Sequence, residues 1–252
     1  MLTDLNGKNV LVTGASSGLG RHFALVLAQA GARVGLAARR VDRLESLQAE
    51  IEALDGRAVP LAMDVCDPES VKQAISSAET ELGPISVLVN NAGVAEAGRS
   101  EDFDLAAWDR VTDTNLRGVW IVAQEIARHM IRLQQGGSII NIASILGLRG
   151  SSGVAAYCAA KAGVINLTHA LASDWARYDI RVNAIAPGYF VTDINRDHLE
   201  GPDGVALLKR IPQRRFGQAG DLDGALLLLA SDLSRYMTGS VLTVDGGQSV
   251  VL

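Results

Sequence analysis

Short runs of apolar and β-branched residues alternate with longer stretches of helical periodicity along almost the whole chain. The short runs fall at residues 9–13, 33–37, 59–63, 85–89, 138–142, 181–185 and 240–244, and nearly all of their residues are apolar. Such runs are typical of parallel strands buried on both faces, and their alternation with helices is typical of α/β folds. The pattern therefore predicts a doubly wound α/β domain, with helices flanking a parallel sheet.

Helices are expected at residues 19–30, 41–54 and 68–82, where glycines mark the ends. Asp67 followed by Pro68 fits an N-cap with proline at the first helical position. Two longer helical stretches, at residues 105–134 and 154–176, are apolar on more than one face. Burial against a large sheet and burial in a subunit interface both explain them.

Residues 189–216 break the alternation, because this segment is long, charged and weakly periodic. Long excursions from a compact domain are often binding loops or lids, so we expect a substrate loop here. No internal repeat, low-complexity tract or linker divides the chain. One domain spanning residues 1–252 is therefore expected.

Composition narrows the function classes. The 252 residues are 48% hydrophobic and carry a net charge of −5, which excludes a disordered chain and argues against a nucleic-acid partner. Two cysteines and four histidines show no metal-ligand spacing, so no metal is expected. The first residues show no signal-peptide pattern and no apolar run approaches a membrane span. These features favour a cytoplasmic protein without a membrane partner.

Three of the 26 glycines fall together near the start of the chain, where the first apolar run leads into Thr13-Gly14-Ala15-Ser16-Ser17-Gly18-Leu19-Gly20 and then a helix. A strand-to-helix turn of this kind aims backbone N–H groups and the positive end of the helix dipole at one point, which suits a pyrophosphate. Glycine lets the backbone turn sharply and approach the ligand. We expect cofactor contacts from Gly14, Ser16, Ser17, Gly18, Leu19 and Gly20; a glycine-rich turn without a ligand is the simpler alternative.

The end of the second predicted strand bears on the choice of dinucleotide. Ala38 stands where an acidic residue commonly holds the ribose 2′-hydroxyl, and Arg39 and Arg40 follow it. A guanidinium there could pair with a 2′-phosphate, so Arg39 favours NADP(H) over NAD(H). A solvated basic loop is the alternative.

Tyr157 and Lys161 are four residues apart, hence on one face of the predicted helix. A neighbouring positive charge favours phenolate, so we expect Lys161 to lower the pKa of Tyr157 and make it a general acid/base. Ser144 follows the strand at residues 138–142, at the sheet edge where ligands of α/β proteins bind. Its hydroxyl could hydrogen-bond a carbonyl oxygen.

Together these motifs resemble the short-chain dehydrogenase/reductase family over nearly the whole chain. The resemblance also rests on Asp64, Asn90-Asn91-Ala92-Gly93, Asn115, Pro187-Gly188 with Thr192, and Asp245-Gly246-Gly247. It implies a Rossmann-type, seven-stranded parallel sheet and a homotetramer or dimer. It also implies that Tyr157 is the acid/base, Ser144 orients substrate, Lys161 holds the nicotinamide ribose and Asn115 supports a proton relay. Further cofactor contacts would come from Asp64, Val65, Asn91, Ala92, Gly93, Pro187, Gly188, Phe190 and Thr192.

Singly, some of these residues have simpler explanations: Asn90 and Asn91 as turn formers, Asn115 as a helix kink and Thr192 as a helix cap. Jointly they indicate an NADP(H)-dependent enzyme that interconverts a small-molecule ketone and a secondary alcohol by hydride transfer. Substrates to consider are 3-oxoacyl thioesters, or sugar acids as in gluconate 5-dehydrogenase-like members. Two other classes remain open: a non-enzymatic dinucleotide sensor, and a hydrolase with Ser16 in a G-x-S-x-G elbow.

Overall fold

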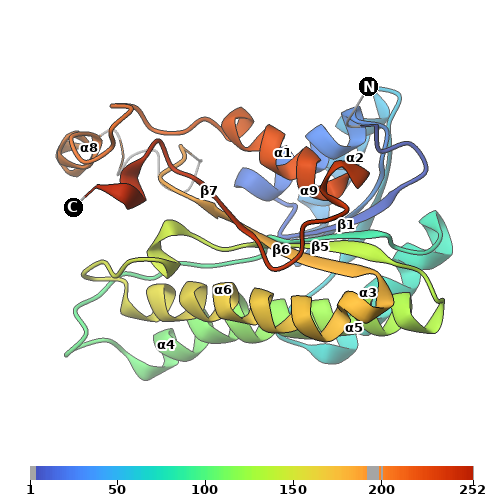
Figure 1. Ribbon diagram of the computed structural model, residues 1–252, viewed down its shortest axis with the longest axis horizontal. Coiled ribbons are helices and arrows are strands. Elements are labelled where there is room, and N and C mark those ends of the chain that lie inside the picture. The colour runs from blue at the N-terminus through green and yellow to red at the C-terminus, as the bar shows by residue number, and fades with distance from the viewer. Residues whose placement is uncertain (1–3, 192–198, 200, 252) are drawn as a thin grey trace.

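The computed structural model describes residues 4–191, 199 and 201–251. Its centre is a sheet of seven parallel strands in the order β3-β2-β1-β4-β5-β6-β7 (Figure 1). The strands are β1 (Asn9–Thr13), β2 (Arg33–Ala38), β3 (Arg57–Ala62), β4 (Val87–Asn90), β5 (Gly137–Ile142), β6 (Ile180–Pro187) and β7 (Val241–Val244). The expected doubly wound, seven-stranded architecture is confirmed.

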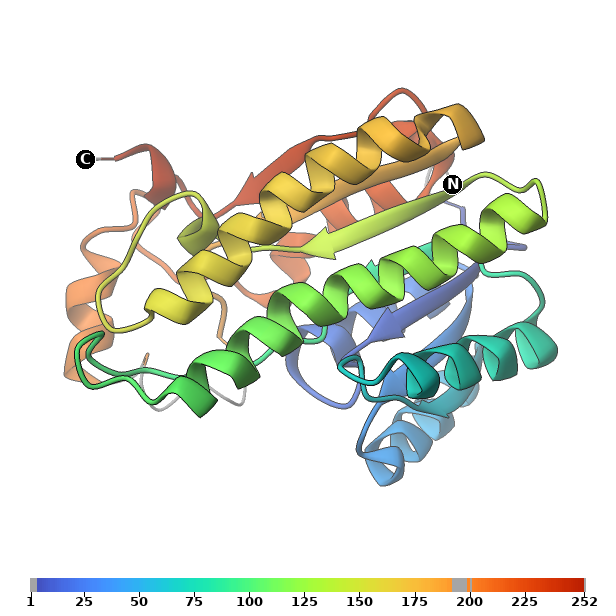
Figure 2. The same cartoon turned by 90° about the horizontal axis from the view of Figure 1, so that it is seen from below.

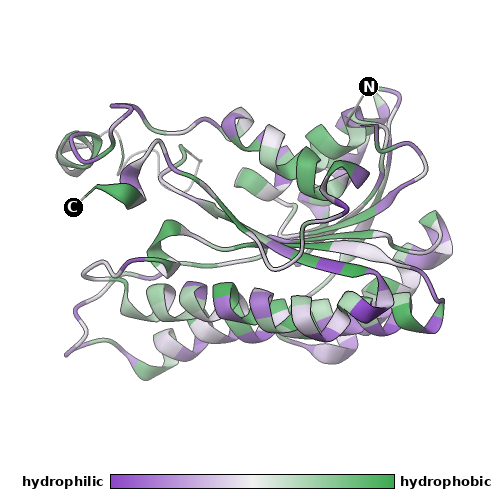
Figure 3. Ribbon diagram, viewed as in Figure 1, coloured by the Kyte–Doolittle hydropathy of each residue, from purple (hydrophilic) through white to green (hydrophobic). Residues whose placement is uncertain are grey.

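Two helical layers cover the sheet, one on each face (Figure 1). One layer holds α1 (Gly18–Gln29), α2 (Val41–Glu52) and α9 (Asp223–Ala230), and the other holds α3 (Pro68–Leu82), α5 (Gly118–Arg132) and α6 (Ala155–Trp175). In Figure 3 the hydrophobic colour concentrates where the layers meet the sheet. Phe23 and Leu226 are fully buried on the first face, and Ile75 and Ile126 on the second. Each such side chain contributes about 1.5–3 kcal/mol through burial.

The strand order reverses between β1 and β4, which are direct neighbours in the sheet. From β1 the chain winds outward through β2 and β3, then returns to β4 and winds the other way. In open α/β sheets such a switch point leaves a crevice at the carboxyl ends of the two strands. The glycine-rich loop after β1 and Asn91 after β4 therefore meet at this edge.

Helix α3 begins as its sequence predicts. The Asp67 carboxylate accepts a hydrogen bond from the Glu69 N–H at 3.0 Å, and Pro68 takes the first helical position. Because the proline has no N–H, it loses nothing at a position where that group would be unpaired.

The helical stretch expected at residues 105–134 is present, and a π turn interrupts its regular α-helical repeat. The structure has α4 (Leu105–Thr112), a π-helical turn (Asp113–Arg117) and α5, in unbroken succession. Asn115 lies in the π turn, and its amide bonds both the N–H and the C=O of Val94 on another segment. A π turn adds one residue to the helical repeat, which redirects a side chain, and such turns are frequent at functional sites. Figure 2 shows α5 and α6 running side by side over this face.

The segment after β6 includes a short helix, α8 (Pro202–Leu208), and a bridge between Phe190 and Gly217. Helix α9, which closes the first layer, was not among the predicted elements. Among the described residues, no helix combines the length and apolar character that crossing a bilayer requires.

Candidate active site

Three predicted site residues meet beyond the carboxyl end of β5. Tyr157 and Lys161 lie one turn apart near the start of α6, with the Lys161 Nζ 5.6 Å from the centre of the Tyr157 ring. Ser144, two residues after β5, is close enough for its hydroxyl to hydrogen-bond the Tyr157 hydroxyl. The Ser144 Oγ also accepts the Leu146 N–H at 3.1 Å, which fixes its side chain. The result is a hydroxyl pair beside a buried amine.

The expectation that Lys161 lowers the pKa of Tyr157 is wrong for the protein alone. Burial raises the pKa of Tyr157 above its ordinary value, while the Ser144 hydrogen bond opposes the rise. The Lys161 Nζ is directed elsewhere: it donates to the Ile142 carbonyl at 2.7 Å. Because the phenol remains protonated at neutral pH, it can act there as an acid.

Lys161 is only 4% exposed. Burial lowers its pKa from 10.5 to about 8, because an ammonium group loses water that one carbonyl does not replace. Its charge is therefore easily removed slightly above neutral pH.

Asn115 reaches the same region from the π turn, where it is fully buried. Its Oδ1 accepts the Val94 N–H at 2.8 Å, and its Nδ2 donates to the Val94 carbonyl at 2.6 Å. A Cβ on Gly93 would lie 2.9 Å from this Oδ1, so the loop after β4 approaches Asn115 only because residue 93 is glycine. Asn115 thus fixes the loop that contains Ala92 and Gly93.

The glycine loop after β1 is held against β4 by two polar side chains. The Thr13 Oγ1 accepts the N–H groups of Asn91 and Ala92, both at 3.0 Å. The Asn91 Nδ2 donates to the Thr13 carbonyl at 3.0 Å. A Cβ on Gly20 would lie 2.3 Å from the Gly14 carbonyl oxygen. The backbone is therefore packed too closely for any larger residue at position 20.

The N-terminus of α1 has the properties of an anion site. Ser17 is its N-cap, but the Ser17 side chain accepts no hydrogen bond from the first turn, which begins at Gly18 and Leu19. Helix N-termini with free N–H groups suit phosphate, aided by the helix dipole. The arrangement of loop and helix fits a dinucleotide.

Arg40, rather than Arg39, contacts this loop. Its Nη2 donates to the hydroxyls of Ser16 and Ser17, each at 3.0 Å. Arg39 is exposed at the end of β2. The positive charge expected near the cofactor's ribose thus comes from two successive arginines, one of them anchored on the loop. Because a guanidinium cannot accept a proton, Arg40 cannot serve Ser16 as a base, and this contact gives no support to a hydrolase.

Asp64 and Val65 follow β3 on the far side of the loop. The Asp64 Oδ1 accepts the Cys66 N–H at 3.0 Å, and the Ser70 Oγ accepts the Asp64 N–H at 3.0 Å. Val65 packs against Gly118, where an added Cβ would lie 2.8 Å from the Val65 Cγ2. These bonds hold the turn and leave the second carboxylate oxygen of Asp64 for other partners.

Pro187 and Gly188 follow β6 at the same edge. A Cβ on Gly188 would lie 2.8 Å from the Asp245 Cα, so this glycine is required by the end of β7. Phe190 is 5% exposed, and its ring lies over Gly217. Its side chain therefore packs in the core and also forms part of the wall of a pocket. Thr192 lies outside the described residues.

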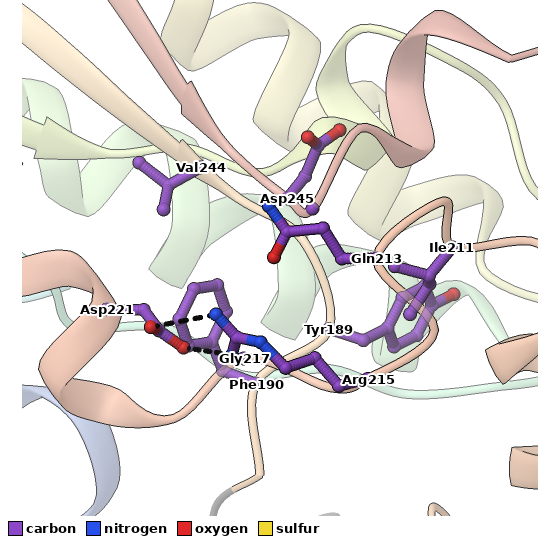
Figure 4. Close-up of a pocket in the computed structure, with 10 residues that line it drawn as sticks. Tyr189, Phe190, Ile211, Gln213, Arg215, Gly217, Asp221, Val244 and Asp245 are labelled. Atoms are coloured by element: carbon purple, nitrogen blue, oxygen red, sulfur yellow. Dashed lines mark hydrogen bonds and ion pairs between the residues drawn. The ribbon is translucent and has the colours of Figure 1, made fainter.

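A pocket of about 220 Å³ lies where the segment after β6 meets the end of β7. Figure 4 shows Tyr189 and Phe190 pointing apart on its wall, with Arg215 paired to Asp221 next to Phe190. The Arg215 Nη1 contacts the Asp221 Oδ2 at 2.5 Å, and Arg215 lowers the pKa of that carboxyl. The pair ties the returning chain at residues 215–221 together beneath Phe190.

Within the described part of the chain, no cluster of His, Cys, Asp and Glu side chains could hold a metal ion.

Comparison with known proteins adds the family. A family model described as short chain dehydrogenase matches residues 8–203. Gluconate 5-dehydrogenase of Gluconobacter oxydans is 39% identical over 252 residues, covering 100% of this chain and 98% of that protein. The 3-oxoacyl-[acyl-carrier-protein] reductase of Thermotoga maritima is 40% identical over 243 residues, covering 96% of this chain and 98% of that protein.

Among solved structures, a gluconate 5-dehydrogenase from Burkholderia cenocepacia, in complex with NADP and tartrate, superposes with a TM-score of 0.95. It is 36% identical and covers 100% of this chain and 98% of its own. Fold, motifs and near-complete alignment agree. The chain belongs to the short-chain dehydrogenase/reductase family and is an oxidoreductase acting on CH–OH and C=O groups.

Proposed function

We propose that the protein interconverts a ketone and a secondary alcohol with NADP(H), and that Tyr157 transfers the proton. The observation that carries the proposal is the Tyr157 hydroxyl, placed beside the Ser144 hydroxyl at the sheet edge that also holds the glycine loop. When bound, NADP(H) supplies or accepts the hydride. The residues of the protein bind the cofactor, orient the substrate and protonate the ketone oxygen.

Proton transfer follows from the two hydroxyls. Because burial raises the pKa of Tyr157, its phenol is protonated at neutral pH and can donate to a ketone oxygen as that oxygen gains charge. The Ser144 hydroxyl, oriented by the Leu146 N–H, binds the same oxygen. Asn115 keeps the loop after β4 in place beside them.

Lys161 holds a positive charge next to this pair while it remains protonated. Its Nζ uses one N–H on the Ile142 carbonyl, so further N–H groups are free for the hydroxyls of a ribose.

The preference for NADP(H) rests on Arg39 and Arg40. Charge-assisted hydrogen bonds to a 2′-phosphate contribute about 1.5–3 kcal/mol each, whereas a 2′-hydroxyl gains little from a guanidinium. Arg40→Gln and Arg39→Gln should each lower kcat/KM for NADPH about tenfold or more, with kcat/KM for NADH nearly unchanged. Arg43→Gln, an exposed residue of α2, is the control for the lost charge. An NADPH/NADH ratio unaffected by both variants would refute the assignment.

A hydroxylated keto acid is the substrate class that the surroundings favour. Burial raises the pKa of Tyr189, and Arg210 lies near enough to oppose the rise. Tyr189 also raises the pKa of Tyr157, so its phenol lies near the catalytic pair, and the Arg210 charge lies near Tyr189. Polar groups here suit the hydroxyls and carboxylate of a sugar acid better than an acyl chain.

A 3-oxoacyl thioester on a carrier protein is the second candidate, since one relative carries that name. An acidic carrier would need basic residues before β5 and β6, where the chain has Gln134, Gln135, Arg177 and Asp179. NADPH oxidation should be followed with 5-keto sugar acids, 3-oxoacyl thioesters and plain ketones. The highest kcat/KM with a keto acid would support the first class, and the highest with a thioester would exclude it.

Tyr157→Phe tests the mechanism directly. The variant should lose turnover with every substrate while NADPH still binds, measured by fluorescence titration. Tyr236→Phe, at a fully exposed residue, is the control and should retain wild-type rates. A Tyr157→Phe enzyme with near-normal kcat would refute the assignment. Turnover by the wild type also separates an enzyme from a dinucleotide sensor.

Two predictions about organisation stay proposals. Exposed apolar side chains on α4 and α5, at Leu105, Trp108 and Trp120, support an assembly of several copies, as a homotetramer would have. The segment at residues 189–216 would close over substrate. Sedimentation velocity tests the first of these, and limited proteolysis with and without NADPH tests the second.

A further inference from the structure

Three buried polar side chains, those of Asn90, Asn141 and Thr168, form a hydrogen-bonded network beneath the site. The Asn90 Nδ2 donates to the Val119 carbonyl at 3.0 Å and to the Asn141 Oδ1 at 3.2 Å. The Asn141 Nδ2 donates to the Thr168 Oγ1 at 3.0 Å, and the Thr168 hydroxyl donates to the Val164 carbonyl at 2.8 Å. None of Asn90, Asn141 and Thr168 is more than 2% exposed.

Each member of this network lies on an element that also holds, or directly precedes, part of the site. Asn90 ends β4 and is followed by Asn91. Asn141 precedes Ile142, whose carbonyl accepts from Lys161. Val119 lies in the first turn of α5, just after the π turn that contains Asn115.

Thr168 connects these strands to α6, the helix of Tyr157 and Lys161. It lies two turns beyond Lys161, and its side chain joins α6 to the network. Only one orientation of the Asn141 amide satisfies both neighbours, because a flip would set its NH₂ against the NH₂ of Asn90. The network therefore fixes the position of α6 along the sheet and also the distance between α6 and the sheet.

We infer that Asn141 and Thr168 are positioning residues, which hold α6 in register with β5 so that Tyr157 and Lys161 meet Ser144 and Asn115. The inference rests on the proposed function for its kinetic test. The apolar contacts of α6, such as those of Leu171 and Ala172, are less directional than this network, because a hydrogen bond restricts both distance and angle.

Thr168→Val tests the inference, because it removes the hydroxyl with little change in volume. A misplacement of about 1 Å can cost about a hundredfold in rate, so we expect kcat to fall tenfold to a hundredfold. The Kd for NADPH should rise by a smaller factor than kcat falls, since the glycine loop is held by Thr13 and Asn91 instead. The midpoint of the pH profile of kcat should also shift, because the surroundings of Tyr157 change.

Matched variants separate positioning from general damage. Thr168→Ser keeps the hydroxyl and should retain most of kcat. Thr80→Val in α3 removes the same bond to a carbonyl four residues earlier, with no buried acceptor role, and should have wild-type kinetics. Asn183→Ala removes another buried asparagine, bonded to Met237 and Ser240, and should lower the melting temperature without lowering kcat at 25 °C.

The outcomes decide the inference. Loss of kcat in Thr168→Val with rescue in Thr168→Ser supports it, and Thr168→Ala replaces the valine variant if that does not fold. Wild-type kcat in the valine or alanine variant overturns it, as does equal loss in the serine variant. If the wild type reduces no ketone, the proposed function fails. The inference is then tested by amide hydrogen exchange of residues 157–161, which must accelerate in Thr168→Val and stay unchanged in Asn183→Ala.

Discussion

Replacing Lys161 by methionine should change how stability depends on pH. The lysine is 4% exposed, its Nζ bonds the Ile142 carbonyl, and its pKa falls from 10.5 to about 8. Methionine has a similar length and no charge, so it removes the titration while it preserves much of the packing.

The sign follows from proton binding. Between pH 8 and pH 10.5 the unfolded chain holds this proton more tightly than the folded protein does, so the free energy of unfolding rises with pH over that window. A depression of this size corresponds to about 3 kcal/mol in total, of which about 2.5 kcal/mol is expected between pH 7 and pH 10. The wild type should therefore gain about 2.5 kcal/mol relative to Lys161→Met across that range.

Urea unfolding of both proteins without cofactor, at pH 7, 8, 9 and 10, measures the effect. Taking the difference between the two proteins cancels the titration of Tyr189 and other groups that both retain. Lys72→Met, at an exposed position of α3, is the control and should give a difference that does not vary with pH. A constant difference for Lys161→Met, or one that moves in favour of the variant as pH rises, would refute the reasoning.

Further predictions concern glycines, a helix cap and catalysis. Gly20→Ala should abolish NADPH binding and destabilise the fold by about 1–3 kcal/mol, because its Cβ would meet the loop backbone, whereas Gly224→Ala in α9 meets open space and should stabilise by about 1 kcal/mol. Thermal melts and fluorescence titration measure both. Asp67→Ala should lower the free energy of unfolding by about 1 kcal/mol through loss of the α3 cap, checked by urea unfolding. Because burial raises the pKa of Tyr157, initial rates of ketone reduction should fall at alkaline pH and those of alcohol oxidation should rise; rates that change in the same direction would contradict this.

Much of the fold could be predicted because buried parallel strands leave a strong apolar signal. Strand β1 matches its predicted range, and α3 begins and ends where Asp67, Pro68 and Gly83 indicate. The π turn between α4 and α5 could not be predicted, since Asn115 bonds Val94 across a distance in sequence that no local pattern reveals.

The site shows a similar division. Tyr157, Lys161 and Ser144 were predicted together and lie together. The predicted direction of the Tyr157 pKa shift was wrong, because the prediction rested on the Lys161 charge and left out the burial of the phenol. The sequence could not show that Arg40 rather than Arg39 contacts the glycine loop, since two adjacent residues on a turn differ only in where their side chains point. Asn141 and Thr168 gave a usable signal, as polar residues in apolar surroundings, but only the structure pairs them.

The neighbouring position of β1 and β4 also constrains how the chain can be assembled. Residues 9–83 form three strands with their helices, but one edge of β1 stays open until β4 pairs with it. An N-terminal fragment that stops before β4 would thus expose an apolar strand edge, the feature that draws chains into aggregates. During synthesis, this edge of β1 stays unpaired until residues 87–90 have been made and β4 can pair with it.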